Sequence, residues 1–140
     1  MTTFENLRAF QRALQLMVEV YAATESFPRR ELYGMTSQIR RASCSVVSHI
    51  AEGQGRLTYG EWRQMLSQAR GSLYEVQAQI IASHMLRFLN DAEAEHLKKH
   101  VRLTGRELTG LIEWVRKREA QTKANSGRSH RQPTTDNRQQ

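Results

Sequence analysis

The sequence predicts an all-α protein, an antiparallel four-helix bundle followed by a disordered basic tail. Apolar residues recur at intervals of three and four along most of the chain, which is the spacing of one helix face. The chain has only two prolines, Pro28 and Pro133, and it lacks the alternating runs typical of strands. No large apolar residue occurs from Gln121 onward. The predicted bundle therefore covers residues 1–120, and the predicted disordered tail covers residues 121–140.

The first two predicted helices form the N-terminal half of the bundle. The first spans residues 4–26 and ends before Pro28, because the residue that precedes a proline is displaced from the helical region. The second spans residues 36–52. Thr36 is its predicted N-cap, and Gly53 is the glycine predicted to end it.

The last two predicted helices complete the bundle. The third begins at a capping box formed by Thr58 and Glu61, and it runs to about Leu89. Gly71 interrupts this helix, and a glycine in a helix interior suggests a tight helix crossing. Residues 90–93, Asn-Asp-Ala-Glu, are the predicted cap and first turn of the fourth helix, which fades near Ala120. Short connections favour an antiparallel arrangement of neighbouring helices.

A second apolar row accompanies the main core stripe late in the third helix. It consists of Tyr74, Ile81, Met85 and Phe88. One interpretation is a thick bundle core. The other is an interface between subunits, since an extra apolar face commonly marks a contact with another protein. The sequence leaves both interpretations open.

The formal net charge of +7 raises the question of an acidic partner, whether nucleic acid, an anionic membrane surface or an acidic protein. Arginines are concentrated around the second and third predicted helices. They are the candidate nucleic-acid-binding residues, namely Arg29, Arg30, Arg40, Arg41, Arg56, Arg63 and Arg70. The last three recur every seven residues. These arginines form either a phosphate-binding surface or an ordinary solvated helix face.

Most of the basic excess lies at the C-terminal end. Residues 116–140 carry seven basic and two acidic residues, whereas residues 1–115 carry fourteen basic and twelve acidic residues. A basic tail adds affinity for nucleic acid without selectivity. Selective binding would therefore depend on the arginines of the bundle.

A short motif lies at the predicted turn between the second and third helices. Glu52 is placed in the last turn of a helix, where its charge opposes the helix dipole, so a cationic partner is expected. Arg56 is the nearest cation, and Gly53 and Gly55 separate the two. We consider two roles, a structural bridge that shapes the turn and a part of a recognition surface. Gly71 belongs to the same set of structural-motif residues.

The sequence gives no positive argument for an enzyme, a cofactor or a metal. His96 and His100 have the spacing of a metal-binding pair, but Lys98 and Lys99 lie between them, so we assign them to a solvated basic face. No nucleophile motif or phosphate loop occurs, and no catalytic residues are predicted. The single cysteine, Cys44, fits a reducing compartment. Without an apolar leader or membrane-spanning run, we expect a cytoplasmic protein with no membrane partner.

Several segments together resemble a known family. They are ELYGMTSQIRRA at residues 31–42, IAEGQGR at residues 50–56 and ARGSL at residues 69–73. Their sequences and spacing resemble the 23S rRNA intervening sequence proteins. The resemblance covers residues 4–118.

The resemblance implies a four-helix protomer that assembles into a barrel-like homopentamer. The chain is also similar to the accessory variability determinant proteins of diversity-generating retroelements, which are basic pentamers that bind a reverse transcriptase and nucleic acid. The family has no established catalytic residues. The expected function is therefore a non-enzymatic homo-oligomeric bundle that binds nucleic acid, RNA in particular. The alternative is an accessory scaffold that binds a reverse transcriptase and its RNA.

Overall fold

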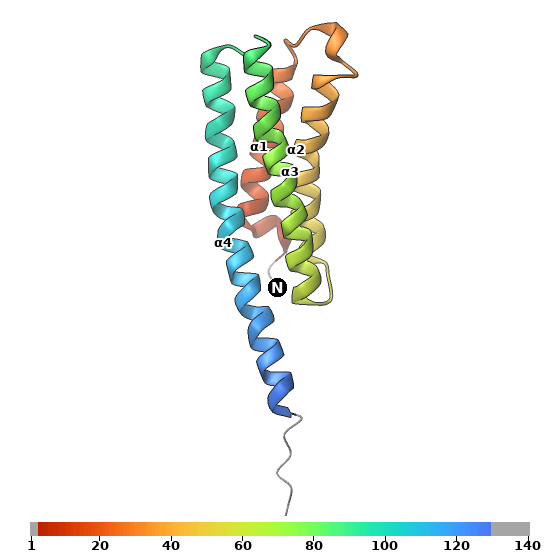
Figure 1. Cartoon of the computed structure of the whole chain (residues 1–140), viewed down its shortest axis with the longest axis vertical. Helices are drawn as coiled ribbons and strands as arrows, with labels where there is room; N and C mark the ends of the chain where they lie inside the picture. The colour runs from red at the N-terminus through yellow and green to blue at the C-terminus, as the bar shows by residue number, and fades with distance from the viewer. Residues whose placement is uncertain (1–2, 130–140) are drawn as a thin grey trace, which may run out of the picture.

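The computed structural model describes residues 3–129, and all regular structure within that range is helical. Figure 1 shows long helices that alternate in direction, which confirms the predicted antiparallel four-helix bundle. The elements in chain order are the short 3₁₀ helix η1 (Phe4–Asn6), α1 (Arg8–Thr24), the 3₁₀ helix η2 (Arg29–Glu31), α2 (Met35–Gln54), α3 (Tyr59–Met85) and α4 (Asp91–Ser129).

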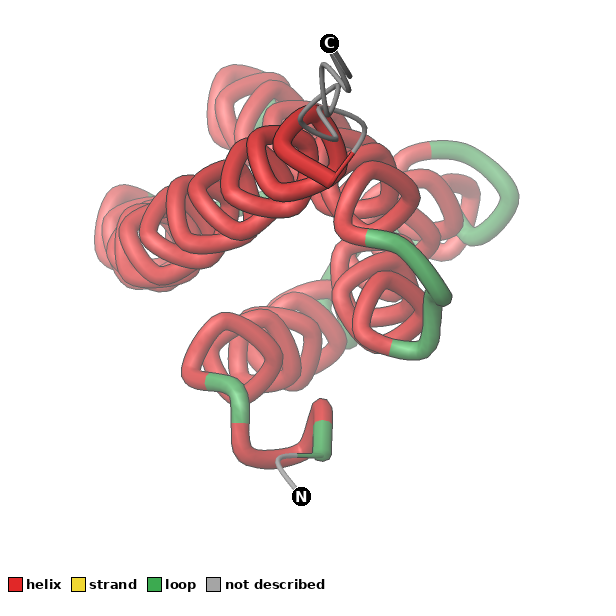
Figure 2. The backbone as a smooth tube through the Cα atoms, turned by 90° about the horizontal axis from the view of Figure 1, so that it is seen from below, coloured by secondary structure: helices red, strands yellow, loops and turns green. Residues whose placement is uncertain are grey.

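Each long helix packs against two others, so the bundle closes on itself. α1 contacts α2 and α4, and α3 contacts the same two helices from the opposite corner (Figure 2). The pair α2 and α3 makes the most extensive contact, and the hydroxyls of Ser45 and Ser72 lie 2.8 Å apart across it. Small side chains on α2 allow this close approach.

The core is apolar and continuous along the bundle axis. Its largest fully buried side chains include Leu16, Ile39, Ile50, Leu66, Ile80, Leu97 and Leu108. Burial of one such side chain contributes about 1.5–3 kcal/mol to stability. On α2, α3 and α4 the apolar residues at helical spacing form the core, whereas on α1 Leu14 and Tyr21 are exposed and Leu16 and Val20 are buried.

The start of α2 differs from the prediction. Thr36 is not the N-cap, because it lies inside the helix and is buried. Gly34 occupies the capping position, and it offers no side chain. The carboxylate of Glu31 takes over this role, since its Oε2 accepts a hydrogen bond from the backbone N–H of Met35 at 3.0 Å. The Glu31 side chain, from the preceding 3₁₀ helix, thus satisfies a backbone N–H that has no partner within α2.

The end of α2 also differs from the prediction. Gly53 does not terminate the helix, which continues to Gln54 with Gly55 at the C-cap in a right-handed conformation. Gly53 is buried against α3. A Cβ added there would lie 2.7 Å from Cδ1 of Trp62, so the glycine is required for close packing.

Local capping signals in the second half of the bundle are confirmed. Thr58 Oγ1 accepts a hydrogen bond from the Glu61 N–H at 3.2 Å. Asn90 and Glu93 cap α4 reciprocally, with N–H to side-chain distances of 2.8 and 3.0 Å. α3 ends a turn earlier than predicted, and Arg87 in the connection has a positive φ of 61°.

The fourth helix is longer than predicted. The expected end near Ala120 is wrong, because α4 continues to Ser129 and projects beyond the other helices (Figure 1). Residues 121–129 are therefore helical, although they are exposed. The rest of the predicted tail, residues 130–140, lies outside the described residues. Within residues 3–129, no helix combines the length and the apolar character needed to cross a membrane.

Candidate nucleic-acid interface

The predicted arginines occupy several regions of the bundle instead of one continuous surface. Arg29 and Arg30 lie in η2, and Arg40 and Arg41 follow near the start of α2. Arg56 lies in the turn between α2 and α3, at the other end of the bundle. The remaining two, Arg63 and Arg70, belong to α3.

Arg40 has a structural role, because it joins α2 to α1. Its Nε donates a hydrogen bond to Thr24 Oγ1 at 2.8 Å, and its Nη2 lies 3.5 Å from Glu25 Oε1. The guanidinium also lies over the ring of Tyr21, 4.6 Å from the centroid. A guanidinium with these partners is not available to phosphate without breaking the contact between the two helices.

Arg56 and Arg63 also have partners within the protomer. Arg56 Nη2 lies 3.9 Å from Glu52 Oε2 and 3.5 Å from the sulfur of Met65. This geometry agrees with a structural bridge across the turn, although an exposed pair at that distance adds little stability. Arg63 Nε donates to Glu119 Oε2 at 2.7 Å.

The Arg63–Glu119 pair joins α3 to the projecting part of α4. The hydrogen bond from Arg63 lowers the pKa of Glu119 below its ordinary value, and a second cation, Lys123, at 3.2 Å lowers it further. Glu119 therefore neutralises part of the positive charge at this end of the bundle.

The other four predicted arginines are free. The side chains of Arg29, Arg30, Arg41 and Arg70 form no hydrogen bond or ion pair with any residue in the range 3–129. Each is exposed. These guanidinium groups keep their full hydrogen-bonding capacity for a phosphate.

A groove between α3 and α4 brings one of the free arginines together with a second one. We define the α3–α4 groove by the polar residues Arg70, Tyr74, Gln77, Arg102 and Thr109 that line it over a floor that includes Leu73, Val101 and Leu108. Tyr74 is 65% exposed. Arg102 is likewise without an ion pair within residues 3–129. The groove thus combines two free guanidiniums with an exposed aromatic ring.

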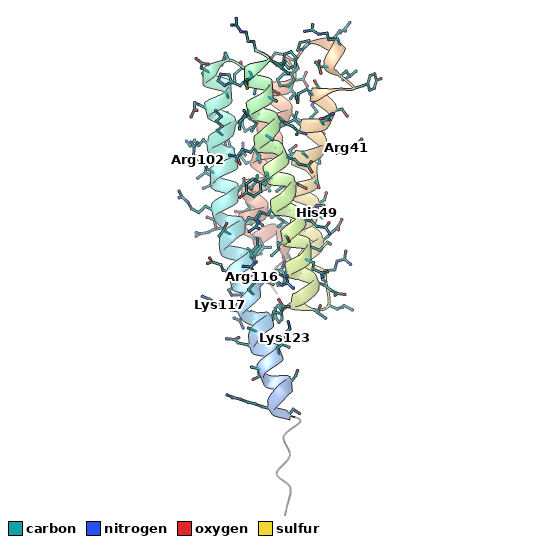
Figure 3. The ribbon with its side chains drawn as sticks, in the orientation of Figure 1. Arg41, His49, Arg102, Arg116, Lys117 and Lys123 are labelled. Atoms are coloured by element: carbon teal, nitrogen blue, oxygen red, sulfur yellow. The ribbon has the colours of Figure 1, made fainter. Side chains whose placement is uncertain are left out.

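Sequence reasoning did not include the basic residues of α4 among the candidate nucleic-acid-binding residues. Arg102, Arg116 and Lys123 are separated by multiples of seven residues, which places them on one helix face. Figure 3 shows these residues along α4, whereas Arg41 lies on α2 at the other side of the bundle. Arg63, Arg116 and Lys123 line a second hollow between the same helices. The heptad spacing could have identified this face, because α3 carries Arg63 and Arg70 at the same interval.

The second apolar row lies mainly on the surface of the protomer. Tyr74, Ile81 and Met85 are 65%, 45% and 80% exposed, so the interpretation as thick core is wrong for them. Phe88 does not share this face. Its ring packs against Phe27 at a centroid distance of 5.5 Å and contacts the core.

Gly71 does not mark a helix crossing within the protomer. A Cβ added there would meet no atom within 4 Å. The glycine is exposed on α3. The prediction of a tight crossing at Gly71 is therefore wrong for the protomer.

Comparison with known proteins identifies the family. No curated protein matches the chain in a sequence comparison. The family described as 23S rRNA-intervening sequence protein matches residues 5–110. That range includes α1, α2 and α3 and most of the part of α4 that packs in the bundle. The chain therefore belongs to the 23S rRNA-intervening sequence protein family.

Proposed function

We propose that this protein is a non-enzymatic, homo-oligomeric bundle that binds nucleic acid, RNA in particular, through the α3–α4 groove. The observation that carries the proposal is the combination of free Arg70 and Arg102 with exposed Tyr74 in one groove. Guanidinium groups bind phosphate oxygens through paired hydrogen bonds. An exposed aromatic ring offers a stacking surface for an unpaired base.

The arginines and the tyrosine of the groove would contact different parts of an RNA. Phosphate contacts by Arg70 and Arg102 would hold the backbone and carry no sequence information. Stacking on Tyr74 would contribute about 1–3 kcal/mol per base and would tolerate different bases. RNA with unpaired bases is the ligand that fits both contacts, since its bases are accessible to an aromatic side chain.

Binding through phosphates has a quantitative signature in salt. The logarithm of the affinity falls linearly with the logarithm of the salt concentration, with a slope near −0.7 per phosphate contact for single strands. We expect the double variant R70Q/R102Q to weaken RNA binding and to reduce the magnitude of this slope by about 0.7 for each lost contact. The measurement is fluorescence anisotropy with a labelled single-stranded RNA over a range of salt concentrations.

The matched control is R29Q/R30Q, which removes the same charge from η2, away from the groove. We expect R29Q/R30Q to bind RNA nearly as the parent chain does. An equal loss in both double variants would show that binding follows overall charge instead of the groove. The absence of any binding near about 50 mM salt, where electrostatic binding is strong, would contradict the whole proposal.

A protein partner is the second candidate. Ile81 and Met85 form an exposed apolar face on the same helix as Arg70 and Tyr74. Such a face suits either another copy of the chain, as in a homopentamer, or a reverse transcriptase held together with its RNA. Copurification from the native host separates the functions. A polymerase in the complex supports the scaffold function, and RNA alone supports the first proposal.

A further inference from the structure

Two histidines and a glutamate come together on a face of the bundle away from the α3–α4 groove. His96 and His100 lie one turn apart on α4, and Glu19 projects from the neighbouring helix α1. Glu19 Oε2 and His96 Nε2 are 2.9 Å apart. The two imidazole rings meet edge to face, with centroids 4.8 Å apart. One potential ligand atom from each residue lies within 4.8 Å of the other two.

We propose that Glu19, His96 and His100 form a binding site for a divalent transition metal of the zinc type. Two imidazole nitrogens and one carboxylate oxygen are a donor set that zinc uses, with water in the fourth position. Tetrahedral coordination with bonds near 2.0–2.1 Å places the ligand atoms about 3.3 Å apart. The three side chains would therefore have to close by about 1.5 Å at most, which rotation of partly exposed side chains allows.

The carboxylate is already oriented for this role. Gln15 Nε2 donates a hydrogen bond to Glu19 Oε1 at 2.9 Å, which leaves Oε2 directed at His96. Hydrogen bonds of this kind hold a metal ligand in position before the metal binds. The Nδ1 atom of His100 is buried and has no hydrogen-bond partner among the described residues, so no competing bond through that atom fixes the ring.

The surroundings of Glu19 and His100 also favour the protonation states in which these two residues bind a metal. The hydrogen bond from His96 lowers the pKa of Glu19, which keeps its carboxylate ionised. Burial and the proximity of His96 lower the pKa of His100, which favours its neutral imidazole, whereas Glu19 acts in the opposite direction. Arg12 and Lys99 are nearby cations that lower this pKa further and would reduce the affinity for a metal ion.

The metal would connect the first and last helices of the bundle. Lys98, which lies between the two histidines in the sequence, is 3.9 Å from Glu95, so its positive charge is partly neutralised. Glu19 is separated from His96 by 77 positions in the chain, so no motif in the sequence could have paired them. A ligand that binds only the folded chain raises its stability in proportion to the logarithm of the free metal concentration.

The test uses the full chain without an affinity tag. Calorimetric titration with zinc chloride should give one ion per chain, and the midpoint of thermal unfolding should rise with zinc concentration. Cobalt(II) chloride should produce the visible absorption of a tetrahedral complex. The variants H96Q, H100Q and E19Q should each weaken zinc binding by at least about tenfold.

The matched control is H84Q. His84 also pairs with a carboxylate, since its Nε2 lies 2.7 Å from Asp91 Oδ1, but the described residues offer no third ligand there. H84Q should bind zinc as the parent chain does. Equal weakening in H84Q would overturn the assignment, because it would indicate scattered surface binding.

NMR of the parent chain removes any dependence on how the variants fold. The imidazole nitrogen resonances of both His96 and His100 should shift on addition of zinc, and those of His84 should not. Unchanged His96 and His100 resonances at saturating zinc would overturn the proposal, whatever the variants show. Circular dichroism of each variant establishes whether a loss of affinity is separate from a loss of fold.

Discussion

Trp62 fills the space that the absent side chain of Gly53 leaves on α2. A Cβ at Gly53 would lie 2.7 Å from Cδ1 and 3.2 Å from Nε1 of the indole, and 3.3 Å from Cβ of Met65. The indole also lies within an aromatic cluster with Tyr59 and Trp114. Its movement would therefore disturb the packing of α2, α3 and α4 together.

We predict that Gly53→Ala destabilises the bundle. Overpacking of a filled core costs about 1–3 kcal/mol, which outweighs the gain of at most about 1 kcal/mol in helix propensity. The matched control is Gly71→Ala, at a helical glycine with open space around it. That change should stabilise the protein by about 0.5–1 kcal/mol. Urea unfolding measures both, and equal shifts of the two midpoints would contradict the packing role of Gly53.

We predict that the Arg63–Glu119 pair stabilises the bundle near neutral pH and that this stabilisation is lost in acid. The hydrogen bond from Arg63 holds the pKa of Glu119 below 4.5 in the folded protein, so the unfolded chain binds more protons in that range. The stabilisation is present above pH 4.5 and is lost as the pH falls through the lowered pKa. The free energy of unfolding of E119Q should fall less steeply between about pH 6 and pH 3. Parallel curves for E119Q and the parent chain would rule this out.

We predict that the exposed apolar face of α3 is an interface between copies of the chain. The double variant I81E/M85E should dissociate the oligomer into monomers and leave the helix content unchanged, because both side chains are exposed in the protomer. Native mass spectrometry and light scattering measure the outcome. Leu57→Glu is the control, at a residue that is 97% exposed and lies in the α2–α3 connection. A parent chain that is monomeric at all concentrations would refute the prediction.

We predict that the C-terminal segment contributes non-selective affinity for RNA. Deletion of residues 121–140 removes four basic residues and one acidic residue, and it should flatten the salt dependence of binding. The loss caused by R70Q/R102Q should persist in the shortened chain. Truncation after Ser129, which keeps all of α4, should give an intermediate slope. An unchanged slope in both truncations would show that this segment does not contact RNA.

Local signals in the sequence predicted the four helices and the caps of α3 and α4, but not the two ends of α2. The Thr58 cap and the turn at Asn90 depend on residues a few positions apart, so the sequence contains all the information needed. The end of the fourth helix could not be predicted from amino-acid composition alone. A segment without large apolar residues cannot build a core, but it can extend a helix that is already nucleated. Residues 121–129 do so.

Long-range pairs explain what the sequence could not show. Arg40 has the same appearance in the sequence as Arg41, yet only Arg40 reaches Thr24 and Glu25 of the preceding segment. The contact between Gly53 and Trp62 likewise depends on how α2 and α3 cross. Which arginines are free and which glycine is packed are properties of the tertiary arrangement, and residue type does not reveal them.

The projecting end of α4 has a thermodynamic consequence. Val115 is the last buried residue of the helix, and the part from residue 116 to residue 129 extends for about 21 Å. An isolated helix of that length is only marginally ordered in water, so its population depends on what lies against it. A ligand that binds the helical form of this arm more tightly than the coil shifts its coil–helix equilibrium toward the helix. Far-ultraviolet ellipticity of the arm would then report occupancy without a label, and affinity would depend on temperature through helix fraying.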